Sequence, residues 1–266
     1  MSKKSLKFLD KMSKRLKQLK QSINFYRQEF WSVLRKLKLF IITQPEKVNH
    51  LKVKIRCRKK WYGSNYGGFY LNPDKINENS IVYSFGIGKD ITFDKRIMKK
   101  HGCKVFAFDP TPKSIEYVDD SKPSSLFNFF RYGIGTTTKI EKFYLPKNKH
   151  GVSGSMEINE SLDENCFVEV PMRTIKDITS EFGHSKIDVL KMDIEGSEYV
   201  VLESILKSGI NIGQILVEFH DRLVNSGEYR SKNIVNLLSE KGFNIFGISA
   251  SYEEVSFINN SIAQGN

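Results

Sequence analysis

The chain of 266 residues is long enough for one large domain or for a domain with an extension, and its 39% hydrophobic content is typical of a soluble globular protein. Its net charge of +12 is concentrated near the start: residues 1–60 hold 19 Lys or Arg against 3 acids, and the remainder holds 23 against 27. The three cysteines, Cys57, Cys103 and Cys166, stand far apart and form no CxxC pair. This argues against a disulfide framework or a zinc knuckle and indicates a reducing compartment.

The uneven charge predicts a basic arm over residues 1–60 and a main domain over residues 61–266. Apolar residues recur every three or four positions along the arm, which predicts an amphipathic helix with near-heptad spacing that ends before Pro45. The stripe consists of Leu9, Met12, Leu16, Leu19, Ile23, Tyr26, Phe30, Val33, Leu37 and Ile41. We expect this helix to dock on its own domain or on a second copy, or to attach to an anionic membrane surface or a partner enzyme. Nucleic acid is a third alternative, which the main domain does not support because it has no interleaved basic and aromatic residues.

No apolar run near the start approaches the roughly 20 residues that a membrane span requires, since the longest covers only residues 39–42. Lysines recur through residue 20, so they leave no apolar segment for a signal peptide. We therefore expect a cytoplasmic protein, which the arm could hold peripherally at the inner membrane surface.

From Ser80 onward, short β-rich runs alternate with helical segments. Strands are predicted at 80–85, 104–109, 126–135, 139–145, 166–172, 187–193 and 214–220, followed by a closing hairpin of 243–250 and 254–259. Helices are predicted at 90–101, 174–183, 197–208 and 230–241. This alternation predicts an α/β fold with a largely parallel sheet.

A glycine or a polar residue stands at the end of five predicted strands: Gly86, Asp109, Gly133, Asp193 and His220. Ligands of open α/β sheets bind at the carboxyl ends of the strands. The convergence of five such residues predicts a ligand site along this edge of the sheet.

Gly86 and Gly88 allow a backbone turn to approach a ligand closely, and Asp109, about 20 residues further along, stands where an acid accepts ribose hydroxyls. The alternatives are a simple tight turn for the glycines and a helix N-cap for Asp109. Ile91 occupies the place of the third glycine of a dinucleotide motif, and no helix N-terminus is freed for a pyrophosphate. The pattern therefore favours a nucleoside cofactor without phosphates.

Four segments carry a resemblance to a known family. IDVLKMDIEGSEYVVL (187–202) resembles the signature of the FkbM family of S-adenosylmethionine-dependent methyltransferases. VYSFGIGKDITFD (82–94) and VFAFDPTP (105–112) resemble its first two cofactor motifs, and ILVEFH (215–220) resembles its following strand. The resemblance extends over about residues 61–260. It implies a Rossmann-like class I methyltransferase fold with a mostly parallel seven-stranded sheet, and O-methylation of sugars or of other glycan and natural-product hydroxyls.

Carried over by position, the resemblance implies that the cofactor contacts residues at four strand ends: Gly86, Gly88, Asp109, Tyr132, Gly133 and Asp193. Tyr132 and Gly133 would lie by the adenine, and Asp193 near the methionine end and the substrate. The first motif departs from the family's Asp-x-Gly form, because Ser84 stands in the place of the aspartate. Asp90 is the alternative contact for the cofactor's amino group.

The acids and the histidine that end two predicted neighbouring strands, Asp193, Glu195, Glu218 and His220, form the predicted catalytic set. We expect His220 to be the base that takes a hydroxyl proton, with Asp193 or Glu195 orienting it or the substrate. Glu198 is expected to cap the helix that follows. Glu195 is either a catalytic residue or a second cap of the same helix. In a second reading, Asp193, Glu218 and His220 are ligands of Mg²⁺ or Mn²⁺, and the sequence does not choose between the two mechanisms.

Two loops carry further expectations. KWYGSNYGGFYL (60–71) is either a flexible lid or sugar-stacking surface, or a hydrophobic plug against the first helix of the domain. HGVSGS (150–155), which includes His150, is expected to line the acceptor pocket.

The main functional hypothesis is an S-adenosylmethionine-dependent O-methyltransferase for a hydroxyl of a glycan or a glycolipid precursor. One alternative is a nucleic-acid methyltransferase, which the arm suggests. The Asp-Ile-Glu-Gly segment at 193–196 opposes it, since amino-methylating enzymes usually carry Asp/Asn-Pro-Pro-aromatic there. A further alternative is a catalytically silent module that docks a polymerase or a glycosyltransferase through the N-terminal helix.

Overall fold

The computed structural model describes residues 48–146, 162–221 and 230–263. All of them belong to one compact unit, Pro45–Asn266. The helix predicted within residues 9–41 and the predicted acceptor loop at 150–155 lie outside the described residues. Among the described residues, no helix is long and apolar enough to cross a membrane.

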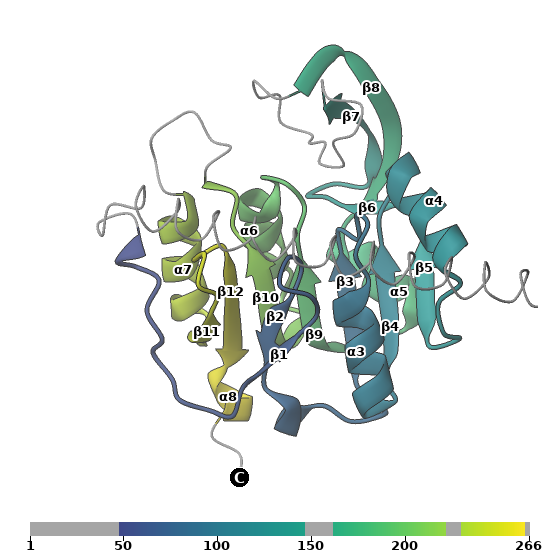
Figure 1. The fold of residues 1–266 in the computed structure, drawn as a ribbon. Coiled ribbons are helices and arrows are strands. Elements are labelled where there is room, and N and C mark those ends of the chain that lie inside the picture. The colour runs from purple at the N-terminus through teal and green to yellow at the C-terminus, as the bar shows by residue number, and fades with distance from the viewer. Residues whose placement is uncertain (1–47, 147–161, 222–229, 264–266) are drawn as a thin grey trace, which may run out of the picture. The chain divides into compact units, whose positions relative to one another are not determined.

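The centre of the unit is a seven-stranded sheet with the order β11-β12-β10-β9-β3-β4-β5 (Figure 1). Its strands are β3 Ile81–Phe85, β4 Lys104–Phe108, β5 Phe127–Phe130, β9 Lys186–Met192, β10 Asn211–Glu218, β11 Phe243–Ile248 and β12 Glu254–Asn259. The strands from β10 to β5 run parallel, whereas β12 pairs antiparallel with both β10 and β11. This arrangement confirms the predicted Rossmann-like methyltransferase fold and the closing hairpin.

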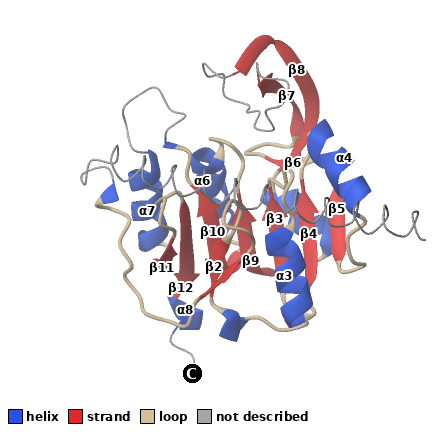
Figure 2. Ribbon diagram, in the orientation of Figure 1, coloured by secondary structure: helices blue, strands red, loops and turns tan. Residues whose placement is uncertain are grey.

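Helices cover both faces of the sheet (Figure 2). They are α3 Thr92–His101, α4 Pro112–Ser121, α5 Ile175–Phe182, α6 Glu198–Ser208, α7 Arg230–Glu240 and the short α8 Asn260–Ala263. Buried side chains of α5, α6 and α7 share one core with the sheet, and those of α3 and α4 share the other. The parallel strands are therefore buried on both faces, which explains their near-continuous apolar runs.

The order of the strands reverses between β3 and β9. The chain continues from β3 to β4 and β5 on one side, and β9 and β10 lie on the other. The crevice at the carboxyl ends of the strands beside such a switch point is where ligands bind in open α/β sheets. The fold thus places the ends of β3 and β9 at the position where a ligand site is expected.

A small hairpin of β1 Lys60–Tyr62 and β2 Phe69–Leu71, followed by the 3-10 helix η1 Pro73–Lys75, precedes the sheet. Tyr62 and Phe69 are fully buried and make edge contacts with the ring of Phe93 on α3. Of the two alternatives predicted for this segment, a lid and a hydrophobic plug, the hairpin is therefore the plug.

Residues 48–60, which the charge pattern groups with the arm, also contact this domain. Leu51 is buried in its core, and the amide of Lys54 donates to the carbonyl of Ile245.

The predicted single strand at 126–135 is divided between two sheets. β5 ends at Phe130, and β6 Gly133–Ile134 pairs with β8 Leu162–Arg173 in a separate three-stranded sheet with β7 Lys139–Pro146. β7 and β8 form an antiparallel pair, so the predicted strand at 139–145 is half of a hairpin. A sequence pattern does not reveal such a change of partner, because both pieces are equally apolar.

Candidate active site

The carboxyl ends of β3, β4 and β9 are linked by backbone hydrogen bonds that continue beyond the strands. The amide of Gly86 donates to the carbonyl of Phe108 (3.1 Å), and the amide of Asp193 donates to the carbonyl of Phe85 (3.0 Å). The turns after these strands therefore lie side by side on one edge of the sheet.

Gly86 lies directly against the end of β9. Its φ of +77° belongs to the left-handed region that favours glycine. A Cβ atom at this position would lie 1.6 Å from the carbonyl oxygen of Asp193. Only glycine fits here, because the turn after β3 lies directly against the backbone carbonyl of Asp193.

The carboxylate of Asp109 organises the glycine turn. Its Oδ2 accepts hydrogen bonds from the amides of Ile87 (2.9 Å) and Gly88 (3.1 Å) and from the hydroxyl of Ser114 (2.8 Å). The N-cap of α4 is Thr111, whose amide donates to Oδ1 of Asp109. Asp109 is therefore in direct contact with the glycine turn with which the sequence groups it.

Ser84 lies in β3, and Asp90, the alternative contact for the cofactor's amino group, lies in the turn after it. The side chain of Ser84, which the resemblance also groups with the cofactor residues, is fully buried beside Asp94 of α3. Asp90 accepts hydrogen bonds from the hydroxyl of Ser64 (2.6 Å) and the amide of Thr92 (2.7 Å). Asp90 thereby ties the β1–β2 loop to the turn after β3.

Tyr132 and Gly133 follow β5. The hydroxyl of Tyr132 donates to Glu181 of α5 (3.3 Å), and the guanidinium of Arg173 lies 4.7 Å from the centre of its ring. A Cβ atom at Gly133 would approach the sulfur of Met172 to 2.7 Å. Both residues therefore border the junction between the two sheets.

Lys191 is a residue at this edge that the sequence reasoning missed. Its ammonium group is buried and donates to the carbonyl of Gly86 (3.0 Å), while it lies 5.7 Å from the ring centre of Phe69. Asp94 of α3 is also fully buried; burial raises the pKa of its carboxyl, and the charge of Lys191 opposes that rise. The signal in the sequence was a lysine inside the otherwise apolar segment IDVLKM.

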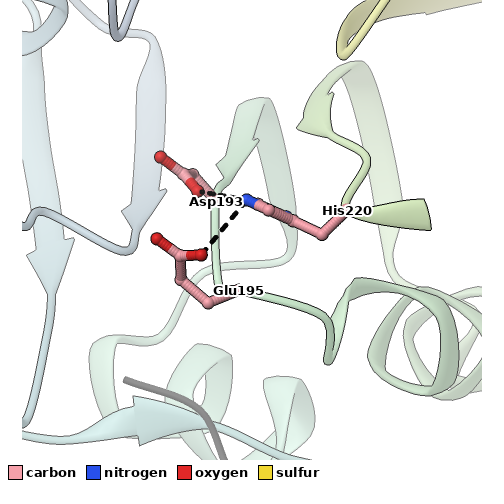
Figure 3. Close-up of side chains that lie close together, drawn as sticks. All are labelled: Asp193, Glu195 and His220. Carbon is pink, nitrogen blue, oxygen red and sulfur yellow. Dashed lines mark ion pairs between the residues drawn. The ribbon is translucent and has the colours of Figure 1, made fainter. Parts of the chain in front are cut away.

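The four side chains of the predicted catalytic set come together around one imidazole. The Nε2 atom of His220 lies 3.7 Å from Oδ1 of Asp193 and 3.4 Å from Oε2 of Glu195 (Figure 3). It also lies 3.5 Å from Oε1 of Glu218. Glu195 has a φ of +55°, which is rare for a residue with a side chain and often marks functional sites.

Glu198 belongs to this cluster, although the sequence indicated only a helix cap. Its carboxylate is fully buried and accepts hydrogen bonds from the amides of Ile194 (3.1 Å) and Gly196 (2.9 Å), so it does satisfy the backbone before α6. Its Oε1 also lies 2.7 Å from Nδ1 of His220. Glu198, rather than Asp193 or Glu195, therefore fixes the orientation of the imidazole.

The acids change the charge state of His220. Burial lowers the pKa of its imidazole, but the hydrogen bond to Glu198 and the charges of Glu198, Asp193 and Glu218 outweigh burial and raise it to about 10. Burial, together with the charge of Asp193, raises the pKa of Glu218. Without a bound cation, the acids therefore favour the protonated form of this imidazole.

A metal ion could be held by part of the same cluster. One ligand atom each from Asp193, Glu195 and His220 lies within 4.8 Å of the others. The structure thus puts Glu195, in place of the predicted Glu218, into the set of three that fits one ion.

Comparisons with known proteins identify the family of the chain. The model of the FkbM methyltransferase domain matches residues 59–245. A human protein named probable methyltransferase-like protein 24 is 27% identical over 201 residues, which cover 73% of this chain and 47% of that protein. The rat protein of the same name is 27% identical over 141 residues, or 52% of this chain and 32% of that protein. The chain thus spans less than half of the length of these curated relatives.

Among solved structures, the chain is similar to the Methanococcus jannaschii fibrillarin pre-rRNA processing protein, with 12% identity and a TM-score of 0.43 over 79% of this chain and 87% of that one. The match to the family model covers more than half of the chain. The chain belongs to the FkbM family of S-adenosylmethionine-dependent methyltransferases.

Proposed function

We propose that the protein transfers the methyl group of S-adenosylmethionine to a hydroxyl oxygen of a sugar, a glycan or a glycolipid precursor. The observation that carries the proposal is the contact between Gly86 and Asp193, which joins the turn expected to hold the cofactor to the acidic cluster. A methyl donor and an acceptor bound on these two sides would meet at the switch point of the sheet.

In the proposed reaction, the acceptor oxygen attacks the methyl carbon in line with the carbon–sulfur bond. A carbon–oxygen bond forms, the carbon–sulfur bond breaks, and S-adenosylhomocysteine leaves with the electron pair. The hydroxyl proton passes to a carboxylate of the cluster, for which Asp193 and Glu195 are suited because they are partly exposed. The sequence predicts His220 as the base, but its side chain is buried and held by Glu198, so we assign it the role of orienting these carboxylates.

The charge of the cluster favours a neutral acceptor over a nucleic acid. Three carboxylates, those of Asp193, Glu195 and Glu198, lie around one imidazole. Such a concentration of negative charge repels phosphate groups, whereas it can accept hydrogen bonds from sugar hydroxyls. The nucleic-acid alternative is therefore the weaker one.

A labelled-methyl transfer assay tests the proposal. The full chain is incubated with methyl-labelled S-adenosylmethionine and, separately, with cell-envelope glycans, nucleic acids and small-molecule pools. We expect label in an alkali-stable methyl ether of a glycan or glycolipid fraction. We also expect loss of that label in Glu195→Gln, which should still bind the cofactor. Label in nucleic acid, or cofactor binding without transfer to any pool, would overturn the proposed acceptor or the proposed activity.

We further propose that residues 1–42 act as a basic amphipathic arm that docks the domain after it at a membrane surface or on a partner protein. The support is the concentration of 12 Lys or Arg against 2 acids in this part of the sequence. Deletion of residues 1–42 should leave activity on a soluble acceptor intact and abolish co-sedimentation with vesicles that contain anionic phospholipid. Unchanged co-sedimentation would contradict membrane docking by the arm.

A further inference from the structure

We propose that Asp193, Glu195 and His220 form a binding site for one divalent cation of the Mg²⁺ or Mn²⁺ class. The three residues come from two neighbouring strand ends: Asp193 and Glu195 follow β9, and His220 follows β10 (Figure 3). Their ligand atoms lie within 4.8 Å of one another. The role in catalysis rests on the proposed methyl transfer, but the binding of the cation does not.

The separations suit ligands of a shared ion better than partners in a hydrogen bond. Nε2 of His220 is 3.4 Å from Glu195 and 3.7 Å from Asp193, whereas charge-assisted hydrogen bonds span about 2.7–2.9 Å. Two ligand atoms that each lie about 2.1 Å from a metal are roughly 3.0–3.6 Å apart for angles of 90–120° at the ion. The observed spacing thus leaves room for an ion between the imidazole and the carboxylates after small adjustments.

The surroundings of His220 are a second, independent indication. Its side chain is only 1% exposed, and its Nδ1 is fixed by the buried carboxylate of Glu198 at 2.7 Å. A histidine that binds a metal through one nitrogen almost always has its other nitrogen held by a carboxylate, a carbonyl or a water. This contact directs Nε2 at Asp193 and Glu195 and makes it the more basic ligand.

The ligand types decide the class of metal. Two carboxylates and one imidazole, without a described thiolate beside them, suit Mn²⁺ and Mg²⁺ better than Zn²⁺ held by cysteines. Three protein ligands leave further positions open in a six-coordinate ion. A cation at this point would lie next to the Gly86–Asp193 contact and would make a nearby acceptor hydroxyl more acidic.

The test is a titration of the full chain with Mn²⁺, followed by electron paramagnetic resonance, in the absence of cofactor and acceptor. We expect one site in the wild type, at least tenfold weaker binding in Glu195→Gln, and about tenfold weaker binding in Glu198→Gln, which loosens His220. Glu203→Gln, an exposed substitution on α6, is the matched control and should bind like the wild type. Thermal unfolding of each variant in the absence of Mn²⁺ verifies that it is folded.

S-adenosylmethionine binding to the same samples, measured by calorimetry, separates this proposal from the proposed function. Cofactor binding without a Mn²⁺ site in the wild type would overturn the cation site and leave methyl transfer standing. If the wild type binds no cofactor but has a Mn²⁺ site that Glu195→Gln weakens, the cation site stands and the proposed methyl transfer is overturned. Equal Mn²⁺ affinity in the wild type and Glu195→Gln would overturn the assignment of the ligands.

Discussion

The buried carboxylate of Glu198 contacts Nδ1 of His220 at 2.7 Å and turns Nε2 of the same ring toward the acids at the ends of β9 and β10. Glu198 is itself held by the amides of Ile194 and Gly196. The strand-to-helix turn and the imidazole are therefore stabilised by one side chain.

Glu198→Gln should reduce the free energy of unfolding by about 1–3 kcal/mol, because one end of the amide would present a donor to backbone N–H groups that now meet an acceptor. Denaturant unfolding measures this loss. A double-mutant cycle with His220→Asn should give a coupling energy of roughly 0.5–3 kcal/mol, since the two side chains are in contact.

Glu203→Gln on the exposed face of α6 is the control for this prediction, and it should change the free energy of unfolding by less than about 0.5 kcal/mol. Equal effects of Glu198→Gln and Glu203→Gln, or a coupling energy of zero between Glu198 and His220, would show that Glu198 does not hold the imidazole.

Lys191→Met should destabilise the protein by about 3 kcal/mol at neutral pH, because it removes the donor to Gly86 and leaves Asp94 buried without its nearby cation. Lys186→Met, an exposed position on the same strand, should cost less than about 0.5 kcal/mol. Asp94→Asn should restore part of the stability that Lys191→Met removes.

The pair of Lys191 and Asp94 also predicts how the free energy of unfolding depends on pH. Burial raises the pKa of Asp94 above its ordinary value of 3.8, so the unfolded chain ionises at lower pH than the folded one. Stability is thus highest below the unfolded pKa and falls as the pH rises toward the folded pKa. Lys191→Met raises the folded pKa further, so its cost in unfolding experiments should be larger at pH 8 than at pH 5. A cost that does not change with pH would contradict the proposed pairing with Asp94.

The cysteines should differ in reactivity. Cys103 is fully buried, and burial raises the pKa of its thiol to about 11, whereas Cys166 is exposed. Iodoacetamide at pH 8 should therefore modify Cys166 in the folded protein and Cys103 only after denaturation, as read by peptide mass spectrometry. Similar rates at both thiols in the folded protein would mean that the core around β4 opens readily.

The order of the central strands was predictable from the sequence because each parallel strand is a short apolar run with a polar residue or a glycine after it, whereas helix α4 was not predicted. The break between β5 and β6 was not, since pairing partners are chosen by the folded sheet. The segment 60–71 was ambiguous for a similar reason: whether Tyr62 and Phe69 form a plug or a lid depends on the position of Phe93.

The sequence predicted most residues of the candidate site, but it did not predict which of them contact one another. Asp193, Glu195, Glu218 and His220 all end strands, so the topology alone brings them near one another. Glu198 and Lys191 lie within regular elements, where a charged residue ordinarily faces solvent or caps a helix. Only the structure shows that both are buried and directed toward the edge of the sheet.

The most direct test of the site is the affinity of the full chain for S-adenosylmethionine in two alanine variants with nearly the same backbone strain. Gly86 and Gly209 have φ values of +77° and +76°, but a Cβ atom at Gly86 collides with Asp193, whereas one at Gly209 meets nothing within 4 Å. Calorimetry should show binding by the wild type and by Gly209→Ala, and at least tenfold weaker binding by Gly86→Ala in protein that is still folded. Absence of binding by the wild type, or equal affinity in all three proteins, would contradict a cofactor site at the ends of β3 and β9.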